Sequence, residues 1–167
     1  VWGIVLDAEL VHTGNLGWAD VEHRVAVNAQ TRFRIASMTK SFTAAAILRL
    51  RDAGRLTLHD PVATHVPELA AISPATRDAP PITIEHLLTH TTGIPNITAL
   101  PDFDAQMPKD FAPRQNVARV EGKPLEFNPG EKFKYSNTNY LLLGMVIEKV
   151  SGLSYADYLQ KHICKPL

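Results

Sequence analysis

The stretch that most constrains this chain is a Ser-x-x-Lys pattern at the entrance to a helix-forming run. An apolar segment, residues 33–36, leads into Ser37 and Lys40, the helix-forming residues continue to Asp52, and Gly54 stops them. If the helix begins near Ser37, a spacing of three places both side chains on one face, one turn apart, at the positive end of the helix dipole. A serine there can become a nucleophile beside an amine that takes its proton. In isolation, the same four residues are better explained as a helix cap with a solvated lysine.

The composition excludes several classes of partner. The chain has 167 residues, enough for one domain with a buried core, and its formal net charge is +0 without any run of Lys or Arg. We therefore expect neither nucleic acid nor an anionic membrane surface as a partner. No apolar stretch approaches the ~20 residues that a membrane span needs. Cys164 is the only cysteine, which excludes a disulfide within the chain and leaves the redox compartment open.

Strand-like sequence is concentrated near the N-terminus. The apolar run 3–6 and residues 10–12 predict two short strands joined by a turn at 7–9. Residues 31–35 alternate between polar and apolar side chains, which predicts a further strand that pairs with, or packs beside, the first two.

The rest of the chain favours helices. The proline-rich stretch 61–81 predicts short helical pieces joined by turns, and a helix is expected to begin at Thr83, with that residue as its N-cap. Residues 140–150 have the apolar spacing of a strong helix that ends at Gly152. A capping box at 154–157 opens the last helix.

Two features in the middle of the chain bear on function. Residues 96–130 have weak periodicity and many prolines, which indicates a loop-rich region of the kind that often selects substrates. His86 and His90 are four positions apart, a spacing that could bind a metal ion, but the His-Glu-x-x-His pattern of zinc proteases and a third ligand are missing. We therefore expect these histidines to be buried or capping residues, and we expect no metal site.

A second polar cluster lies about a hundred residues after Ser37. Tyr135-Ser136-Asn137 occupies a predicted loop before the helix that starts at residue 140. This order and spacing resemble the serine β-lactamase and penicillin-binding-protein superfamily, with the closest likeness to its class C β-lactamase, D-Ala-D-Ala carboxypeptidase and family VIII esterase branch. The flanking sequences agree and extend the resemblance over nearly the whole chain, at residues 33–36, 87–93, 129–130 and 140–144.

The resemblance implies a role for each of four residues. Ser37 would be the acylated nucleophile and Lys40 the amine beside it. Tyr135 would shuttle protons, and Asn137 would contact the substrate amide and steady the lysine; Ser136 matches only a variable middle position. Because an amine acts as a base only when neutral and a phenol only as its phenolate, Lys40 and Tyr135 form a coupled set, and the sequence leaves open which of them holds the proton. The resemblance implies no cofactor.

The same resemblance implies an α+β fold of the β-lactamase/transpeptidase type, in which a helical region packs on an antiparallel sheet. We expect one domain over residues 1–167, with strands at about 1–35 and helices at about 37–167. The third motif of the family, Lys-Thr-Gly or His-x-Gly on a later strand, has no match after Asn137. The segment 90–93, His-Thr-Thr-Gly, is similar but precedes Tyr135, so we expect it to have a structural role. The chain thus looks like an N-terminal portion, and a C-terminal segment of the same protein is expected to complete the sheet.

Residues and resemblance together predict a serine hydrolase that forms an acyl-enzyme with small-molecule or peptide substrates, namely β-lactam or D-Ala-D-Ala-type amides. Asn137 favours an amide, because an amide gives its side chain a hydrogen-bond partner. A carboxylesterase acting on small acyl esters is one alternative, since Ser-Met-Thr-Lys is common in the esterase branch. A non-catalytic binding protein with the same fold is another, supported by the missing third motif. The resemblance favours a periplasmic or secreted location and leaves a cytoplasmic one open.

Overall fold

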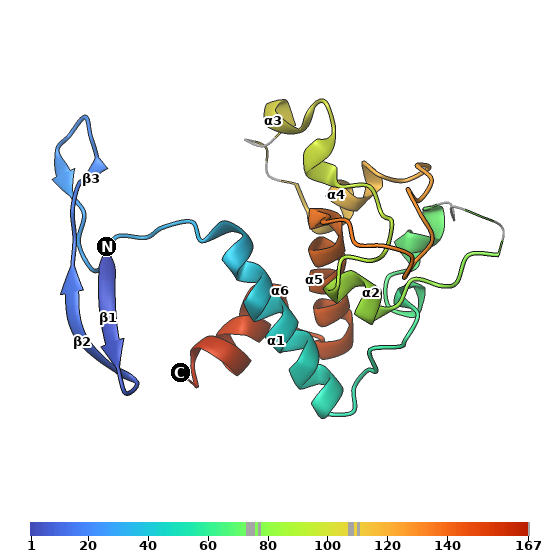
Figure 1. Ribbon diagram of the computed structural model, residues 1–167, viewed down its shortest axis with the longest axis horizontal. Helices are drawn as coiled ribbons and strands as arrows, with labels where there is room; N and C mark the ends of the chain where they lie inside the picture. Colours follow the sequence, from blue (N-terminus) through green and yellow to red (C-terminus); the bar gives the residue numbers. More distant parts are fainter. Residues whose placement is uncertain (73–75, 77, 107–108, 110, 167) are drawn as a thin grey trace. The chain divides into compact units, whose positions relative to one another are not determined.

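The computed structural model describes residues 1–72, 76, 78–106, 109 and 111–166, and the chain divides into two compact units. The N-terminal unit comprises Val1–Ala36 and the helical unit comprises Ser37–Leu167 (Figure 1). Parts of the predicted ranges 61–81 and 96–130 fall on residues 73–75, 77, 107, 108 and 110, which lie outside the described residues. The prediction of one domain over residues 1–167 stays a prediction.

Two antiparallel strand pairs make up the N-terminal unit. β1 (Trp2–Leu6) pairs with β2 (Glu9–Gly14), and β3 (Trp18–Asp20) pairs with β4 (Val25–Ala26). The two residues that join β1 to β2 both have positive φ, as in the tight turns whose twist matches that of a hairpin. The first two predicted strands are confirmed, whereas the sequence pattern did not predict the much shorter β3 and β4.

The strand predicted at residues 31–35 is wrong, because this segment has no regular secondary structure. Phe33 and Ile35, the apolar members of the alternating pattern, are exposed. Alternation shows that a segment suits the surface of a sheet, but a strand also needs a neighbour that accepts and donates its backbone hydrogen bonds. In the described part of the chain, β1 pairs only with β2 and β3 only with β4, so residues 31–35 have no such neighbour.

One long helix, α5 (Asn137–Ser151), is at the centre of the helical unit (Figure 1). It packs against α1 (Thr39–Asp52), α2 (Ile84–Leu88), α4 (Pro113–Ala118) and α6 (Tyr155–Leu159). The apolar side chains of these helices and of the segments that connect them form one core, whose most buried members are Ala46, Ile47, Val62, Ile84, Leu87, Val117, Val120, Leu142, Leu143, Val146 and Ile147. This core holds α1 and α5, the two elements that matter for the site.

Short helical turns connect the longer helices. The proline-rich stretch contains η2 (Val62–Thr64) and η3 (Pro67–Ala71), as predicted, and the loop-rich stretch contains η4 (Ile97–Ala99) and α3 (Phe103–Gln106). A π-helical segment, η5 (Gln160–Cys164), continues α6. Within the described part of the chain, no helix is long and apolar enough to cross a membrane.

The helix ends follow their capping residues. Thr83 accepts the backbone N–H of His86, and His86 Nδ1 accepts the backbone N–H of Thr83, which confirms the expected capping role of this histidine. Gly152 ends α5 in the left-handed conformation, with φ 75°, and Ser154 caps α6. However, α5 begins at Asn137, three residues earlier than predicted, so the polar residues before the apolar run belong to the helix.

Candidate active site

Ser37 and Lys40 lie where a 3-10 turn, Ala36–Met38 (η1), runs into α1. The sequence predicted an α-helix from Ser37, but α1 begins at Thr39. Ala36 has a positive φ of 44°, so the chain turns sharply immediately before the serine. A 3-10 turn also places residues three apart on one side, and the predicted proximity of Ser37 and Lys40 is therefore retained.

Tyr135 and Asn137, which lie just before and at the start of α5, contact the serine and the lysine. Ser37 Oγ lies 2.8 Å from Tyr135 Oη, and the two residues are 98 positions apart. Lys40 Nζ lies 3.3 Å from Ser37 Oγ and 2.8 Å from Asn137 Oδ1. The structure thus brings together all four residues that the sequence singled out, while their catalytic roles stay predictions.

The hydroxyl of Ser37 is held between a cationic donor and the phenol. Lys40 donates to Ser37 Oγ, which leaves the serine hydroxyl hydrogen free to point at Tyr135 Oη. Burial alone would raise the pKa of Tyr135, but hydrogen bonding to Lys40 and Ser37, together with the charge of Lys40, lowers the pKa below its ordinary value. Ser37 is exposed and Tyr135 is 40% exposed, so a substrate carbonyl can reach the hydroxyl.

Two residues that the sequence analysis missed hold the side chain of Asn137. Asn96 Oδ1 accepts the backbone N–H of Asn137 at 3.0 Å and its Nδ2 at 3.4 Å, and Thr98 Oγ1 accepts Nδ2 at 3.1 Å. With both amide hydrogens engaged, Oδ1 of Asn137 faces Lys40. Asn96 also caps η4 by accepting the backbone N–H of Thr98. Asparagine is a common N-cap residue, so its position directly after Pro95 is the one sequence signal that could have predicted a role for Asn96.

The histidines and the segment 90–93 support the structure around the site. His90 is buried, as expected, and His86 caps α2. The backbone of Gly93 passes so close to Phe127 that a Cβ there would overlap the Phe127 carbonyl oxygen. Among the residues that the structure describes, there is no group of three or more His, Cys, Asp or Glu side chains that could hold a metal ion.

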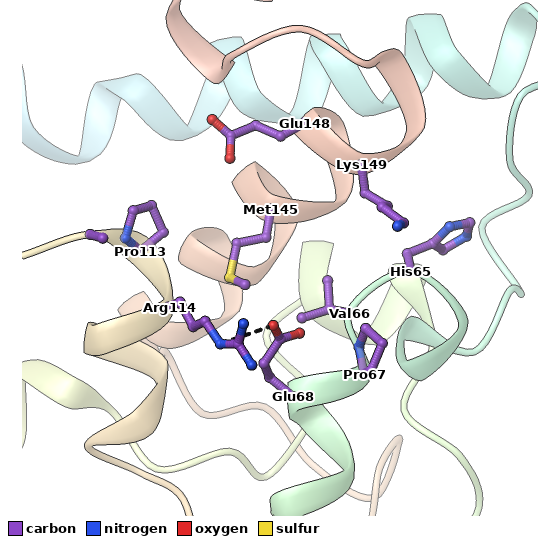
Figure 2. A pocket seen from close by; sticks show the side chains of 10 residues that line it. His65, Val66, Pro67, Glu68, Pro113, Arg114, Met145, Glu148 and Lys149 are labelled. Carbon is purple, nitrogen blue, oxygen red and sulfur yellow. Dashed lines mark ion pairs between the residues drawn. The ribbon is translucent and has the colours of Figure 1, made fainter.

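A separate hollow of about 540 Å³ lies beside η3, α4 and α5 (Figure 2). Met145 contributes apolar surface, and the charged lining consists of two carboxylates and two cations: Glu68, Glu148, Arg114 and Lys149. Arg114 pairs with Glu68 at 3.3 Å. Because the opposite charges offset one another, the hollow favours neither anions nor cations, and none of the four candidate site residues lines it.

Comparison with known proteins gives the chain its relatives. The family model described as Beta-lactamase matches residues 1–167. Protein flp of Staphylococcus aureus (strain MW2) is 38% identical over 164 residues, which make up 98% of this chain and 32% of that protein. The chain therefore spans about a third of the length of the curated relatives it matches.

Two solved structures share the arrangement of elements. The octameric penicillin-binding protein homologue from Pyrococcus abyssi matches with a TM-score of 0.83 and 38% identity over 98% of this chain and 37% of that one. A D-stereospecific amidohydrolase from Streptomyces sp. matches with a TM-score of 0.71 and 36% identity over 80% of this chain and 42% of that one. The fold predicted from the sequence, β-lactamase/transpeptidase-like and present here in part, is confirmed.

Proposed function

The chain belongs to the β-lactamase family, and from this membership we propose that it carries the acyl-transfer residues of a serine hydrolase acting on β-lactam or D-Ala-D-Ala-type amides. The observation that carries the proposal is the hydroxyl of Ser37, held 2.8 Å from Tyr135 Oη and 3.3 Å from Lys40 Nζ. A serine hydroxyl is a weak nucleophile at neutral pH and needs a base to take its proton. A phenol with a lowered pKa beside a cation is suited to that task.

In the proposed acylation step, the proton of the Ser37 hydroxyl passes to the Tyr135 phenolate as Oγ forms a bond to the substrate carbonyl carbon. The carbonyl oxygen becomes an oxyanion, to which the backbone N–H of Ser37 donates. Collapse of this intermediate breaks the C–N bond, and Tyr135 returns the proton to the leaving nitrogen. Lys40 donates to Oγ and stabilises the developing negative charge. Water then cleaves the acyl-enzyme with Tyr135 as base and Ser37 as leaving group.

Asn137 is proposed to receive the substrate amide through its oxygen. Both hydrogens of its Nδ2 are directed at Thr98 and Asn96, whereas Oδ1 accepts from Lys40 and lies 3.4 Å from the Tyr135 hydroxyl. Once Tyr135 is the phenolate, it no longer donates, and the second lone pair of Oδ1 is free. Asn137 would therefore accept an N–H from an amide substrate. The relatives described as a penicillin-binding protein homologue and as a D-stereospecific amidohydrolase are consistent with an amide.

We propose further that a C-terminal segment of the same protein completes the sheet. The segment would supply the third motif of the family and a second donor to the oxyanion. Supporting this proposal, the chain covers about a third of its curated relatives, and apolar side chains of the N-terminal unit are exposed.

The test is to incubate the intact protein with a labelled penicillin and to locate the label by intact mass and peptide mapping. We expect a single label on Ser37 and none in Ser37→Ala. Ser41→Ala is the matched control, because Ser41 is an exposed serine of α1, one turn after Ser37, and no hydrogen bond among the described residues joins its side chain to any of the four. A label on another serine, or undiminished labelling of Ser37→Ala, would contradict the assignment.

The supporting residues are tested through the acylation rate. Lys40→Ala and Tyr135→Phe should each slow acylation by ~10² or more, the usual loss when general-base assistance is removed. Near-normal rates in both variants would make the two residues structural. Turnover of a short-chain ester without turnover of amides would favour the carboxylesterase alternative, and binding without acylation would favour the non-catalytic one.

A further inference from the structure

Behind Tyr135 lies a small cluster of buried polar groups that the acyl-transfer mechanism does not use. His90, Thr92, Ser136 and Asn139 are 8%, 1%, 2% and 0% exposed. They come from two segments, the loop after α2 and the start of α5. The side chains of His90, Thr92 and Asn139 and the backbone N–H of Ser136 are joined by hydrogen bonds, as buried polar groups usually are, whereas the Ser136 hydroxyl has no partner among the described residues.

The hydrogen bonds of this cluster run in one direction. The backbone N–H of Ile94 donates to Thr92 Oγ1 at 3.0 Å, and Thr92 donates its hydroxyl hydrogen to Asn139 Oδ1 at 2.8 Å. This contact fixes the orientation of the Asn139 amide, so that its Nδ2 faces His90 Nδ1 at 3.3 Å. The backbone N–H of Ser136 points at the same Nδ1 at 3.2 Å.

Two N–H donors therefore converge on His90 Nδ1, which can receive them only as an unprotonated nitrogen. A hydrogen on Nδ1 would face both donors with no acceptor in reach. The single ring hydrogen of His90 must accordingly lie on Nε2. The N–H of Ser136 is an obligatory backbone donor, so Nδ1 must be the acceptor whichever way the Asn139 amide is oriented.

The imidazole ring also supports the phenol from one side. The ring centres of His90 and Tyr135 lie 4.5 Å apart, and those of His90 and Tyr140 lie 5.1 Å apart. His90 has a positive φ of 57°, a conformation that is uncommon for residues other than glycine. Its main chain is also engaged, since the backbone N–H of Lys134 donates to the His90 carbonyl at 2.9 Å.

We infer that His90 is a positioning residue, whose neutral Nε2–H form holds the 135–137 turn through the Ser136 N–H and thereby keeps Tyr135 Oη against Ser37. The inference rests on the proposed function, because the position of Tyr135 matters only if Ser37 is acylated. His90 itself touches no reacting atom. It acts through the backbone of Ser136 and through the face of the Tyr135 ring.

A pH dependence follows from this arrangement. The ionisable groups that face the ring are Tyr135 from the loop, Tyr140 from α5 and, through its charge, Lys40 from α1. Burial lowers the pKa of His90, and the charge of Lys40 lowers it further, so the ring is neutral at neutral pH. Protonation in acid would put a hydrogen on Nδ1, break its bond with Ser136, and place a second cation near Lys40.

The first experiment uses no substrate. Nitrogen-15 NMR of the histidine rings in the intact protein should show His90 with an unprotonated Nδ1 and a protonated Nε2 at neutral pH. A protonated Nδ1 would overturn the inference. Because this measurement does not involve acylation, it separates a failure of the inference from a failure of the proposed function, which would appear as unlabelled Ser37.

The second experiment compares two variants that both tolerate a positive φ. His90→Asn places an acceptor oxygen near the position of Nδ1, whereas His90→Gly removes the acceptor. We expect His90→Gly to slow acylation about 10- to 100-fold at saturating substrate, and His90→Asn to restore most of that loss. His90→Asn should also remove the part of the acid-side loss of activity that comes from protonating the imidazole.

Equal rates for His90→Gly and His90→Asn, or a wild-type rate in His90→Gly, would overturn the inference. His59→Asn is the control, because His59 is an exposed histidine of the same unit that pairs with Glu85, and its replacement should change neither rate nor pH profile. If His90→Gly does not fold, the tautomer and the pH profile of His90→Asn decide the question.

Discussion

The two units of the molecule use their apolar residues in opposite ways. In the N-terminal unit, every residue of β1 is exposed, and Trp2 and Leu10 are 51% and 62% exposed. Val27 is the only described residue of that unit with a buried side chain. In the helical unit, by contrast, Leu142 and Ile147 of α5 are 0% exposed. One unit therefore has a core of its own, and the other exposes the residues that would form one.

This difference explains where the candidate site lies. Ser37, Lys40, Tyr135 and Asn137 all belong to the helical unit, in or beside α1 and α5. Distances such as the 2.8 Å between Ser37 Oγ and Tyr135 Oη persist only on elements that packing holds in place. A two-stranded ribbon such as β1–β2 is marginal by itself, and its exposed edges invite pairing. The helical unit supports the geometry, whereas the N-terminal unit leaves most of its apolar side chains exposed.

The largest expected effect comes from testing the segment 1–167 without any further chain. We expect it to be inactive and poorly soluble, or to fold only when the remaining C-terminal segment is bound, because exposed strand edges and apolar side chains favour association. The measurements are its size in solution, the cooperativity of its thermal unfolding, and its hydrolysis of a chromogenic β-lactam and a short-chain ester. A monodisperse monomer with a sharp transition and multiple turnovers would show that the N-terminal unit needs no further segment.

The next largest effect is on the free energy of unfolding when a large apolar side chain is replaced by alanine in either unit. Leu142→Ala in the intact protein should lower the free energy of unfolding by about 2–5 kcal/mol, as large-to-small changes in a packed core do. Val5 and Leu6 are consecutive residues of β1 that pair in regular register with Leu10 and Glu9, and so they point to opposite faces of the hairpin. If a C-terminal segment covers one face, Val5→Ala or Leu6→Ala should cost more than about 1 kcal/mol in urea unfolding.

Changes below about 0.5 kcal/mol in both hairpin variants would mean that neither face is covered, because surface substitutions have effects of that size. That outcome would contradict the proposed C-terminal segment while leaving the prediction for Leu142 intact.

The sequence alone predicted some parts of this fold correctly and others wrongly, and the difference lies in how distant the interacting residues are. Local signals succeeded: Thr83, Gly152 and Ser154 mark helix ends because a cap depends on residues within one turn. The predicted strand at 31–35 failed, because pairing depends on a distant partner that alternation does not reveal.

In the candidate site, too, local signals were predictable and contacts between distant residues were not. The spacing of Ser37 and Lys40 is local, and the family resemblance supplied Tyr135 and Asn137. Asn96 was missed because its role consists of contacts with a residue 41 positions away. The sequence patterns used above do not predict contacts between residues so far apart in the chain.

Two glycines, one in each unit, allow the cost of adding a side chain to the backbone to be compared. Gly93 in the helical unit and Gly17 in the N-terminal unit have positive φ, 76° and 94°. A Cβ at Gly17 meets nothing within 4 Å, so Gly17→Ala should cost only the conformational strain, about 1–2 kcal/mol. A Cβ at Gly93 would overlap the Phe127 carbonyl oxygen, so Gly93→Ala should cost clearly more in urea unfolding. Equal losses would show that the backbone around Gly93 can move freely.

The smallest expected effect is the dependence of stability on pH. Burial lowers the pKa of His86 and of His90, so each is neutral in the folded protein at a pH where the unfolded chain, with its ordinary value of 6.5, binds a proton. The stability associated with these groups is fully present above pH 6.5 and is lost as the pH falls below it. Hydrogen bonds from His23 lower the pKa of Asp20 in the N-terminal unit, and the stability associated with Asp20 is lost only as the pH falls below 3.8. Urea unfolding between pH 7.5 and pH 5 should therefore show a decline that His90→Asn reduces and Asp20→Asn leaves unchanged. An undiminished decline in His90→Asn would mean that the buried imidazole does not titrate in this range, and it would assign the acid sensitivity to groups elsewhere in the protein.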